Sequence, residues 1–175
     1  MSDDIILTID GQVERPLRLT FADLAAFPEP AQVRDVSRFH PTRKGDGVSL
    51  DVILEKAAVR PSANYLTLHA QRDDFHVSVP LEPLRGQGIV VYRVGPDPLG
   101  VELGGPIRFL IRDPSACHTD QLDECANVKY LSRIELTERR GRDTRPADEK
   151  AHEALHATQD APAPVSSAGT WPARH

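Results

Sequence analysis

The sequence predicts an α+β fold, with a mixed β-sheet and a few short helices. Short segments in which apolar and polar residues alternate, as in half-buried strands, recur along most of the chain, and the clearest helix signals cover only two short segments. The strand patterns cover residues 5–10, 65–69, 75–79, 89–94, 107–112 and 128–136. Many short strands with few short helices are typical of the α+β class.

Length and composition allow one folded domain. The chain has 175 residues, of which 39% are hydrophobic, and this is enough for one modest core. Its net charge of −5 argues against a nucleic-acid binder with a broad basic face. No run approaches the roughly 18 apolar residues of a membrane span. The acidic N-terminus carries no apolar leader pattern, so we expect a cytoplasmic protein.

The first elements are two strands and a short helix. A strand over residues 5–10 ends at the turn-forming Gly11, and the chain returns through residues 13–19. Thr20 then offers a hydroxyl N-cap, and Asp23 is an acidic residue three positions later. This spacing predicts a capped helix, which the prolines that follow end early.

The central stretch, residues 33–54, combines basic side chains with a helix start. After an apolar beginning, it carries Arg34, Arg38, His40, Arg43 and Lys44. A Gly-Asp-Gly turn follows, and Ser49 is the expected N-cap of an amphipathic helix with apolar residues at positions 50, 53, 54 and 57. Guanidinium groups bind phosphate well, so the loop suits an anionic cofactor or small molecule. A solvated turn is the alternative.

Two strands, residues 65–69 and 75–79, are predicted to form a hairpin around a turn at 72–74. His76 would share the polar face of its strand, where we expect it to be solvated. Apolar periodicity disappears after residue 137, so residues 138–175 are predicted to be a disordered tail. The predicted domain therefore spans residues 1–137.

The segment before the last strand, residues 113–127, contains both cysteines of the chain. Cys117, His118 and Cys125 lie in it together with acidic residues. Two thiolates and one imidazole are one ligand short of a closed zinc site, although a metal or redox site can be built from them. Two buried, inert thiols are the alternative.

Four segments in the same order resemble the molybdopterin-binding domain of oxidoreductases with the sulfite-oxidase fold. They read L-x-I-D-G-x-V-x-x-P-L-x-L-T-x-x-D-L, A-x-Y-L-x-L…D-D-F-x-V-x-V-P-L, P-L…G-P-I-R and V-K-Y-L…I-E-L. A further match, Gly47-Val48-Ser49-Leu50, opens the central helix. The resemblance covers about residues 5–137 and implies the same mixed α+β fold.

The resemblance also implies a cofactor and its contacts. In the family, a cysteine in the loop before the G-V-x-L helix ligates molybdenum, and in this chain Asp35 stands at that position. The basic residues Arg38, His40, Arg43 and Lys44 are the expected contacts to the phosphate of such a cofactor, and the resemblance adds Lys129, which matches the family's closing lysine. Lys129 could equally be an ordinary strand lysine. Asp35 could supply a hard oxygen ligand, or it could cap the loop or pair with Arg38.

Two functions follow from the sequence. The first is a molybdopterin-binding oxidoreductase-like domain whose oxygen-atom transfer is altered or lost because Asp35 replaces the thiolate. The second is a noncatalytic module of the same fold that binds an anion or a partner protein. Neither function involves nucleic acid or a membrane.

Overall fold

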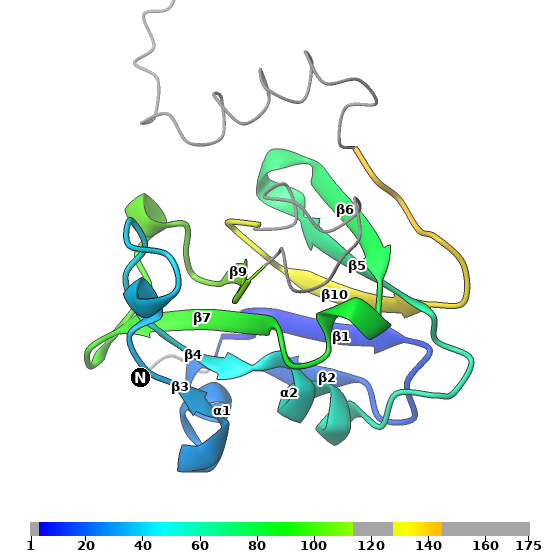
Figure 1. Cartoon of the computed structure of the whole chain (residues 1–175), viewed down its shortest axis with the longest axis horizontal. Helices are drawn as coiled ribbons and strands as arrows, with labels where there is room; N and C mark the ends of the chain where they lie inside the picture. The colour runs from blue at the N-terminus through cyan, green and yellow to red at the C-terminus, as the bar shows by residue number, and fades with distance from the viewer. Residues whose placement is uncertain (1–3, 114–127, 145–175) are drawn as a thin grey trace, which may run out of the picture. The chain divides into compact units, whose positions relative to one another are not determined.

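The computed structural model describes residues 4–113 and 128–144 of the chain. The described residues form two five-stranded sheets with short helices, which confirms the predicted α+β fold (Figure 1). The α-helices are α1 (Phe21–Ala25) and α2 (Leu50–Ala57). Single 3₁₀ turns are η1 (Glu29–Ala31), η2 (Val36–Arg38), η3 (Gln71–Asp73), η4 (Glu82–Leu84) and η5 (Val101–Leu103). No helix among residues 4–113 and 128–144 is long and apolar enough to cross a membrane.

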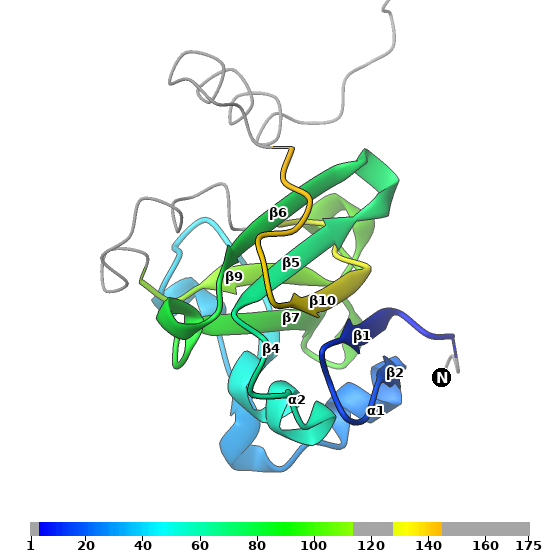
Figure 2. The ribbon, with the colours of Figure 1, turned by 90° about the vertical axis from the view of Figure 1, so that its right-hand side faces the viewer.

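The first sheet has the strand order β2-β1-β10-β5-β6. Its strands are β1 (Leu7–Gly11), β2 (Leu17–Leu19), β5 (Tyr65–Ala70), β6 (Phe75–Pro80) and β10 (Arg133–Thr137). β1 pairs with β10 in parallel, and the other neighbours are antiparallel. The strand at the C-terminal end of the described chain therefore occupies the middle of this sheet (Figure 2).

The second sheet runs β3-β4-β7-β8, with β9 also paired to β7. Its strands are β3 (Gln32–Val33), β4 (Asp46–Ser49), β7 (Gly88–Val94), β8 (Asp97–Pro98) and β9 (Arg108–Ile111). The predicted Gly-Asp-Gly turn is wrong in part. Gly45 has a φ of +124°, but Asp46 and Gly47 already belong to β4. A Cβ on Gly47 would lie 2.5 Å from the carbonyl oxygen of Val90, so the close pairing with β7 requires this glycine.

The capping box predicted at Thr20 is confirmed. The Thr20 hydroxyl accepts from the Asp23 N–H at 3.1 Å, and the Asp23 carboxylate accepts from the Thr20 N–H at 2.9 Å. The helix that it begins ends at Ala25, before the prolines. Ser49 also precedes a helix as predicted, but its side chain accepts no capping hydrogen bond. The apolar stripe of α2 is buried as expected, at Leu50, Ile53, Leu54 and Ala57.

Replacing Thr20 with alanine should lower the free energy of unfolding by about 1 kcal/mol, the usual effect of losing a side-chain cap. Thr20→Ser keeps the hydroxyl and should retain most of this stability. Urea unfolding of the two variants and the wild type measures the difference. Equal losses in both variants would contradict a contribution from the cap.

The polar face of the β5–β6 hairpin is buried, against expectation. His76 was expected to be solvated, but it is 5% exposed, and Thr67, His69 and Ser78 are similarly buried. The cover is the segment 139–144, shortly after the end of β10 (Figure 2). We call residues 139–144 the strap. The sequence could not reveal this cover because the strap lacks apolar residues and makes polar contacts instead.

The strap hydrogen-bonds to β6 along its outer edge. Gly141 N–H donates to the Ser78 hydroxyl at 2.8 Å, and Thr144 N–H donates to the His76 carbonyl at 2.8 Å. Asp143 accepts from the Ser78 N–H at 3.2 Å. The compact unit of the chain accordingly extends to Thr144, beyond the predicted domain end at residue 137. Residues 145–175, the rest of the predicted tail, lie outside the described part.

Candidate functional site

The basic loop, residues 34–44, is anchored through apolar side chains on the second sheet. Val33 and Val36 are buried in one cluster with residues of β7 and β9, and Phe39 packs against it. The cluster comprises Val33, Val36, Ile89, Val91, Leu99 and Leu110. The apolar residues of the loop therefore fix its backbone against β7 and β9, which leaves its polar residues at the surface.

Asp35 has the most constrained backbone of this loop. Its φ is 55°, in the left-handed region that non-glycine residues seldom adopt. Two acceptors hold this conformation. The Asp35 N–H donates to Asp46 Oδ1 at 2.8 Å, and the Asp35 carboxylate accepts from the Ser37 N–H at 3.2 Å and from its hydroxyl at 2.5 Å. Asp35 is exposed and caps the η2 turn, so its carboxylate already has partners.

Two guanidinium groups flank the ring of Phe39. The Arg38 guanidinium carbon lies 5.0 Å from the ring centroid, and that of Arg112, which follows β9, lies 4.7 Å from it. Arg38 also donates to the carbonyl oxygens of Arg34, at 2.7 Å, and Asp35, at 3.2 Å. Arg38 therefore contacts Asp35 through the backbone carbonyl and not through the carboxylate, which the suggested Asp35–Arg38 pair would have used. The structure places two arginines together where the sequence predicted only the first.

His40 joins the loop to the end of β9. Its Nε2 lies 2.5 Å from the carbonyl oxygen of Ile111, which fixes a proton on that nitrogen because a carbonyl can only accept. The Arg43 N–H donates to the His40 carbonyl at 2.8 Å. Arg43 is half-buried and Lys44 is exposed. His40 therefore acts first as a structural link between the loop and β9.

Lys129 lies at the opposite end of β9. Val128, the residue before it, forms an isolated antiparallel bridge with Phe109, and this brings Lys129 beside Arg108. Gly104, which has a φ of +94°, lies against both side chains. A Cβ on it would lie 2.8 Å from Arg108 Nη1 and 2.9 Å from Lys129 Cβ, so the close contact requires a glycine. The Lys129 ammonium lies 5.5 Å from the Tyr130 ring centroid. The loop and Lys129 thus occupy the two ends of one strand.

The charges beside the loop are held in a network. Arg34 binds Glu29 through three contacts of 2.9 to 3.2 Å, and its hydrogen bonds lower the pKa of the Glu29 carboxyl. Asp46 lies 3.7 Å from Arg34 and 3.9 Å from Arg93. Arg34 is accordingly engaged by acids, unlike Arg38, whose described hydrogen bonds go to backbone carbonyls. This difference favours Arg38 over Arg34 as an anion contact.

The donor set fits the anionic part of a molybdopterin. Arg108 and Arg112 lie two positions on either side of Leu110 and share its face of the strand, because side chains alternate along a strand. Together with Arg38 and Lys129 they offer donors suited to a phosphate. The position expected to ligate molybdenum provides a hard carboxylate oxygen, where a soft thiolate would be usual. The residues therefore fit the pterin better than the metal.

The other predicted metal ligands, Cys117, His118 and Cys125, lie outside the described residues. Within residues 4–113 and 128–144, no group of three or more His, Cys, Asp and Glu side chains is arranged to hold a metal ion. The metal or redox site suggested for the segment 113–127 stays a prediction.

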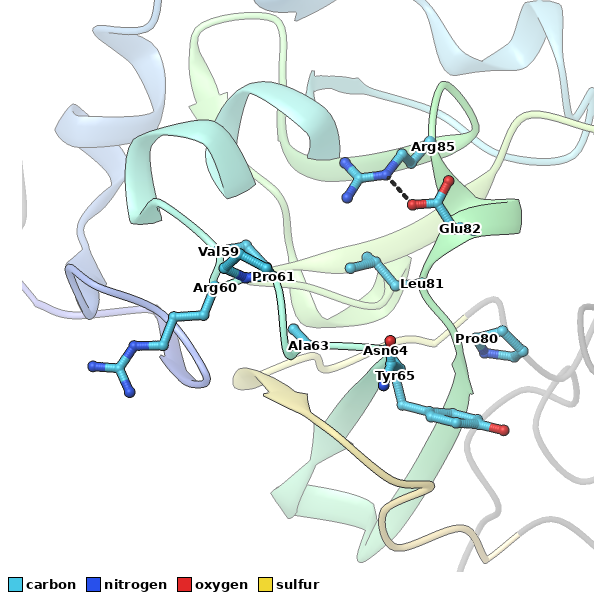
Figure 3. Close-up of a pocket in the computed structure, with 10 residues that line it drawn as sticks. All are labelled: Val59, Arg60, Pro61, Ala63, Asn64, Tyr65, Pro80, Leu81, Glu82 and Arg85. Carbon is cyan, nitrogen blue, oxygen red and sulfur yellow. Dashed lines mark hydrogen bonds and ion pairs between the residues drawn. The ribbon is translucent and has the colours of Figure 1, made fainter.

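A pocket of about 580 Å³ lies elsewhere, between the α2–β5 connection and the β6–η4 connection (Figure 3). Arg60 and Arg85 extend on its rim, and Tyr65 contributes an aromatic ring. Both arginines face acids, because Arg60 lies 3.3 Å from Glu14 and Arg85 lies 2.8 Å from Glu82. None of the predicted site residues lines this pocket. The candidate site lies at the basic loop because Arg38 of the loop and Arg112 meet there on the ring of Phe39.

Sequence reasoning missed Asp46, Arg108 and Arg112. Arg108 stood within a motif of the resemblance, so that signal was available. Arg112 appeared only as the end of a strand, and Asp46 as part of a turn. Their roles depend on pairing between distant segments, which no local pattern reports.

Comparisons with known proteins identify the family of this chain. The model of the oxidoreductase molybdopterin binding domain family matches residues 42–144, more than half of the chain. This span includes Arg43, Lys44 and Lys129 but begins after Asp35. The uncharacterized oxidoreductase YuiH of Bacillus subtilis is 31% identical over 107 residues, which are 58% of this chain and 54% of YuiH. The chain thus spans about half the length of this curated relative.

A solved structure shares the fold. The sulfane dehydrogenase SoxCD from Paracoccus pantotrophus superposes with a TM-score of 0.58 and 23% identity, over 80% of this chain and 40% of that one. The similarity supports the sulfite-oxidase-like fold predicted from the four segments, and the family supports molybdopterin as the cofactor. The chain belongs to the oxidoreductase molybdopterin-binding domain family.

Proposed function

We propose that this chain binds molybdopterin between the basic loop and β9 and serves as an oxidoreductase domain with altered oxygen-atom transfer. The observation that carries the proposal is the convergence of Arg38 and Arg112 on Phe39, with Arg108 and Lys129 at the other end of the same strand. The bound cofactor would supply the redox chemistry of its metal. The chain's own residues would hold the phosphate and orient the pterin.

Asp35 is the reason to expect altered chemistry. Its carboxylate accepts two hydrogen bonds from Ser37, and a metal would have to compete with both. A carboxylate oxygen is also a harder ligand than a thiolate, so it would change both the affinity for molybdenum and its redox potential. Arg38, His40, Arg43, Lys44 and Lys129 remain proposed cofactor contacts.

The test is to measure cofactor in protein expressed in a host that makes molybdopterin. Pterin fluorescence after oxidation and metal analysis should both be measured on the freshly purified wild type and on Asp35→Cys. We expect pterin in both proteins and more molybdenum in Asp35→Cys, because the cysteine adds a soft ligand. Asp35→Ser serves as the size-matched control and should gain no molybdenum.

Absence of pterin from all three proteins would refute the cofactor assignment. Pterin without any gain of molybdenum in Asp35→Cys would show instead that position 35 does not face the metal. The second result would leave the binding of the pterin intact.

The alternative is a noncatalytic module that binds an anion or a partner protein through the basic loop. It is favoured by one observation, that Asp35 is exposed and acts as the cap of the η2 turn. Under this alternative, Asp35 serves to cap the η2 turn and does not ligate a metal. A partner captured equally by wild type and Asp35→Asn, from protein that contains no pterin, would support it.

A further inference from the structure

Two histidines of the β5–β6 hairpin face each other in a buried, hydrogen-bonded row. His69 and His76 are paired directly across the strands, and their Nδ1 atoms lie 2.7 Å apart. At the outer ends of the row, His69 Nε2 lies 3.0 Å from Glu135 and His76 Nε2 lies 3.0 Å from Asp74. The two histidines are 7% and 5% exposed. Neither the cofactor contacts nor the sequence motifs account for them.

The partners determine how many protons the two rings hold. An ionised carboxylate only accepts, so each Nε2 must carry a proton. The two Nδ1 atoms can approach to 2.7 Å only if one proton lies between them, since two lone pairs or two N–H groups would repel. Three protons are therefore shared by two imidazoles, and the pair carries one positive charge.

The surrounding charges identify which ring is cationic. Burial lowers the pKa of His69, although the hydrogen bond to Glu135 opposes this effect. The hydrogen bond from His76, together with the charge of Arg142, lowers the pKa of Asp74. His69 is therefore the neutral acceptor of the shared proton, and the hydrogen-bond geometry leaves the one positive charge of the pair on the ring beside Asp74. The other charged groups packed around the pair are Arg133 on β10, Asp10 on β1, and Arg140 and Asp143 on the strap.

The strap is attached at the same histidine. Two hydrogen bonds join Thr144 to the backbone of His76. The backbone N–H of His76 donates to the Thr144 hydroxyl at 2.9 Å, and the backbone N–H of Thr144 donates to the His76 carbonyl at 2.8 Å. Arg142 lies 3.1 Å from Asp74, the acid that accepts the hydrogen bond of the His76 ring. A rearrangement of the His76 ring would thus disturb both the backbone and the charge contacts of the strap.

We propose that His69 and His76 form a shared-proton site that controls attachment of the strap to β6. With three protons the row is complete and the strap is closed. A fourth proton, on His69 Nδ1, replaces the N–H···N bond with two opposed N–H groups. The rings then separate, and the contacts of Thr144 and Arg142 with the hairpin are lost.

The direction of the pH dependence follows from His69. Because its pKa is lowered in the folded protein, the unfolded chain binds the additional proton more readily, and stability rises with pH where the two states differ. The attachment is therefore retained above the ordinary histidine range, near pH 6.5, and weakens as the pH falls below it. Protonation of Asp74, whose pKa is also lowered, would weaken it only in stronger acid.

Nuclear magnetic resonance of the full chain tests the proposal. Imidazole nitrogen spectra at neutral pH should show His76 protonated at both nitrogens and His69 protonated at Nε2. As the pH falls from 7 to 5, both rings should become doubly protonated. Over the same range, protection of the Gly141 and Thr144 amides, corrected for intrinsic exchange, should fall about tenfold or more, the equivalent of one pKa unit. Protection of Val90 in the other sheet should stay constant.

Two variants distinguish the histidine pair from a general effect of acid. In Glu135→Gln the loss of strap protection should occur at a lower pH than in the wild type, because the carboxylate that favours protonation of His69 is gone. Glu82→Gln, which removes an acid bound to Arg85, should leave the transition in place. Two neutral rings at pH 7 would overturn the proposal. Strap protection that does not change while the fourth proton binds would overturn it equally.

Discussion

Replacing Gly11 with alanine should destabilise the domain by about 3 kcal/mol, the sum of a left-handed conformation and an overpacked contact. Gly11 has a φ of +91°, and a Cβ on it would overlap the carbonyl oxygen of Leu136. This oxygen belongs to the backbone of β10, and it also accepts from the Gln12 N–H at 2.8 Å. Relief of the overlap would therefore require the parallel pair β1–β10 to separate. Urea unfolding followed by circular dichroism measures the loss.

Gly86→Ala is the matched control. Gly86 also has a positive φ, +78°, but no atom lies within 4 Å of its would-be Cβ. It should lose only the roughly 1 to 2 kcal/mol of the left-handed conformation. If both variants lost the same stability, the close approach of β1 to β10 would contribute nothing beyond the conformation of glycine.

Combining Arg38→Gln with Lys129→Gln should weaken cofactor binding about 100-fold or more. Each substitution removes a hydrogen bond to a charged group, worth about 1.5 to 3 kcal/mol. The two residues lie at opposite ends of β9, so their effects should add. The pterin retained per chain after dialysis, measured by fluorescence, gives the change. Urea unfolding of the same variant separates weakened binding from loss of the fold.

The control is the pair Arg60→Gln and Arg85→Gln on the rim of the 580 Å³ pocket. This double substitution removes the same amount of positive charge from a different part of the surface and should leave retention of pterin unchanged. If this control lost the cofactor and the first pair kept it, the binding site would lie in the pocket shown in Figure 3.

Local signals predicted most elements of the fold. The Thr20 capping box and the apolar stripe of α2 depend on residues within one or two turns, and both appear in the structure. The Gly-Asp-Gly segment was different, because a turn signal at Gly45 could not show that Asp46 would pair with β7. Where the structure of a segment depends on pairing with a distant strand, the sequence alone did not predict that structure.

The candidate site shows the same division. Arg38, His40 and Lys129 were identified from a charge cluster and a motif, and the structure places all three around β9. The cap formed by Asp35 was one of the predicted alternatives. The buried state of His76 was predicted wrongly, because an alternating strand indicates which residues share a face but not what covers that face. The cover is a polar segment more than 60 positions away.

The central place of β10 has a consequence for synthesis of the chain on the ribosome. The β1–β2 and β5–β6 hairpins are complete early, but in this sheet only β10 joins them. Until residue 137 has left the exit tunnel, β1 and β5 each present an unpaired edge, which is a template for association with other chains. A nascent chain arrested before β10 should therefore need a chaperone, whereas one arrested after the strap should not.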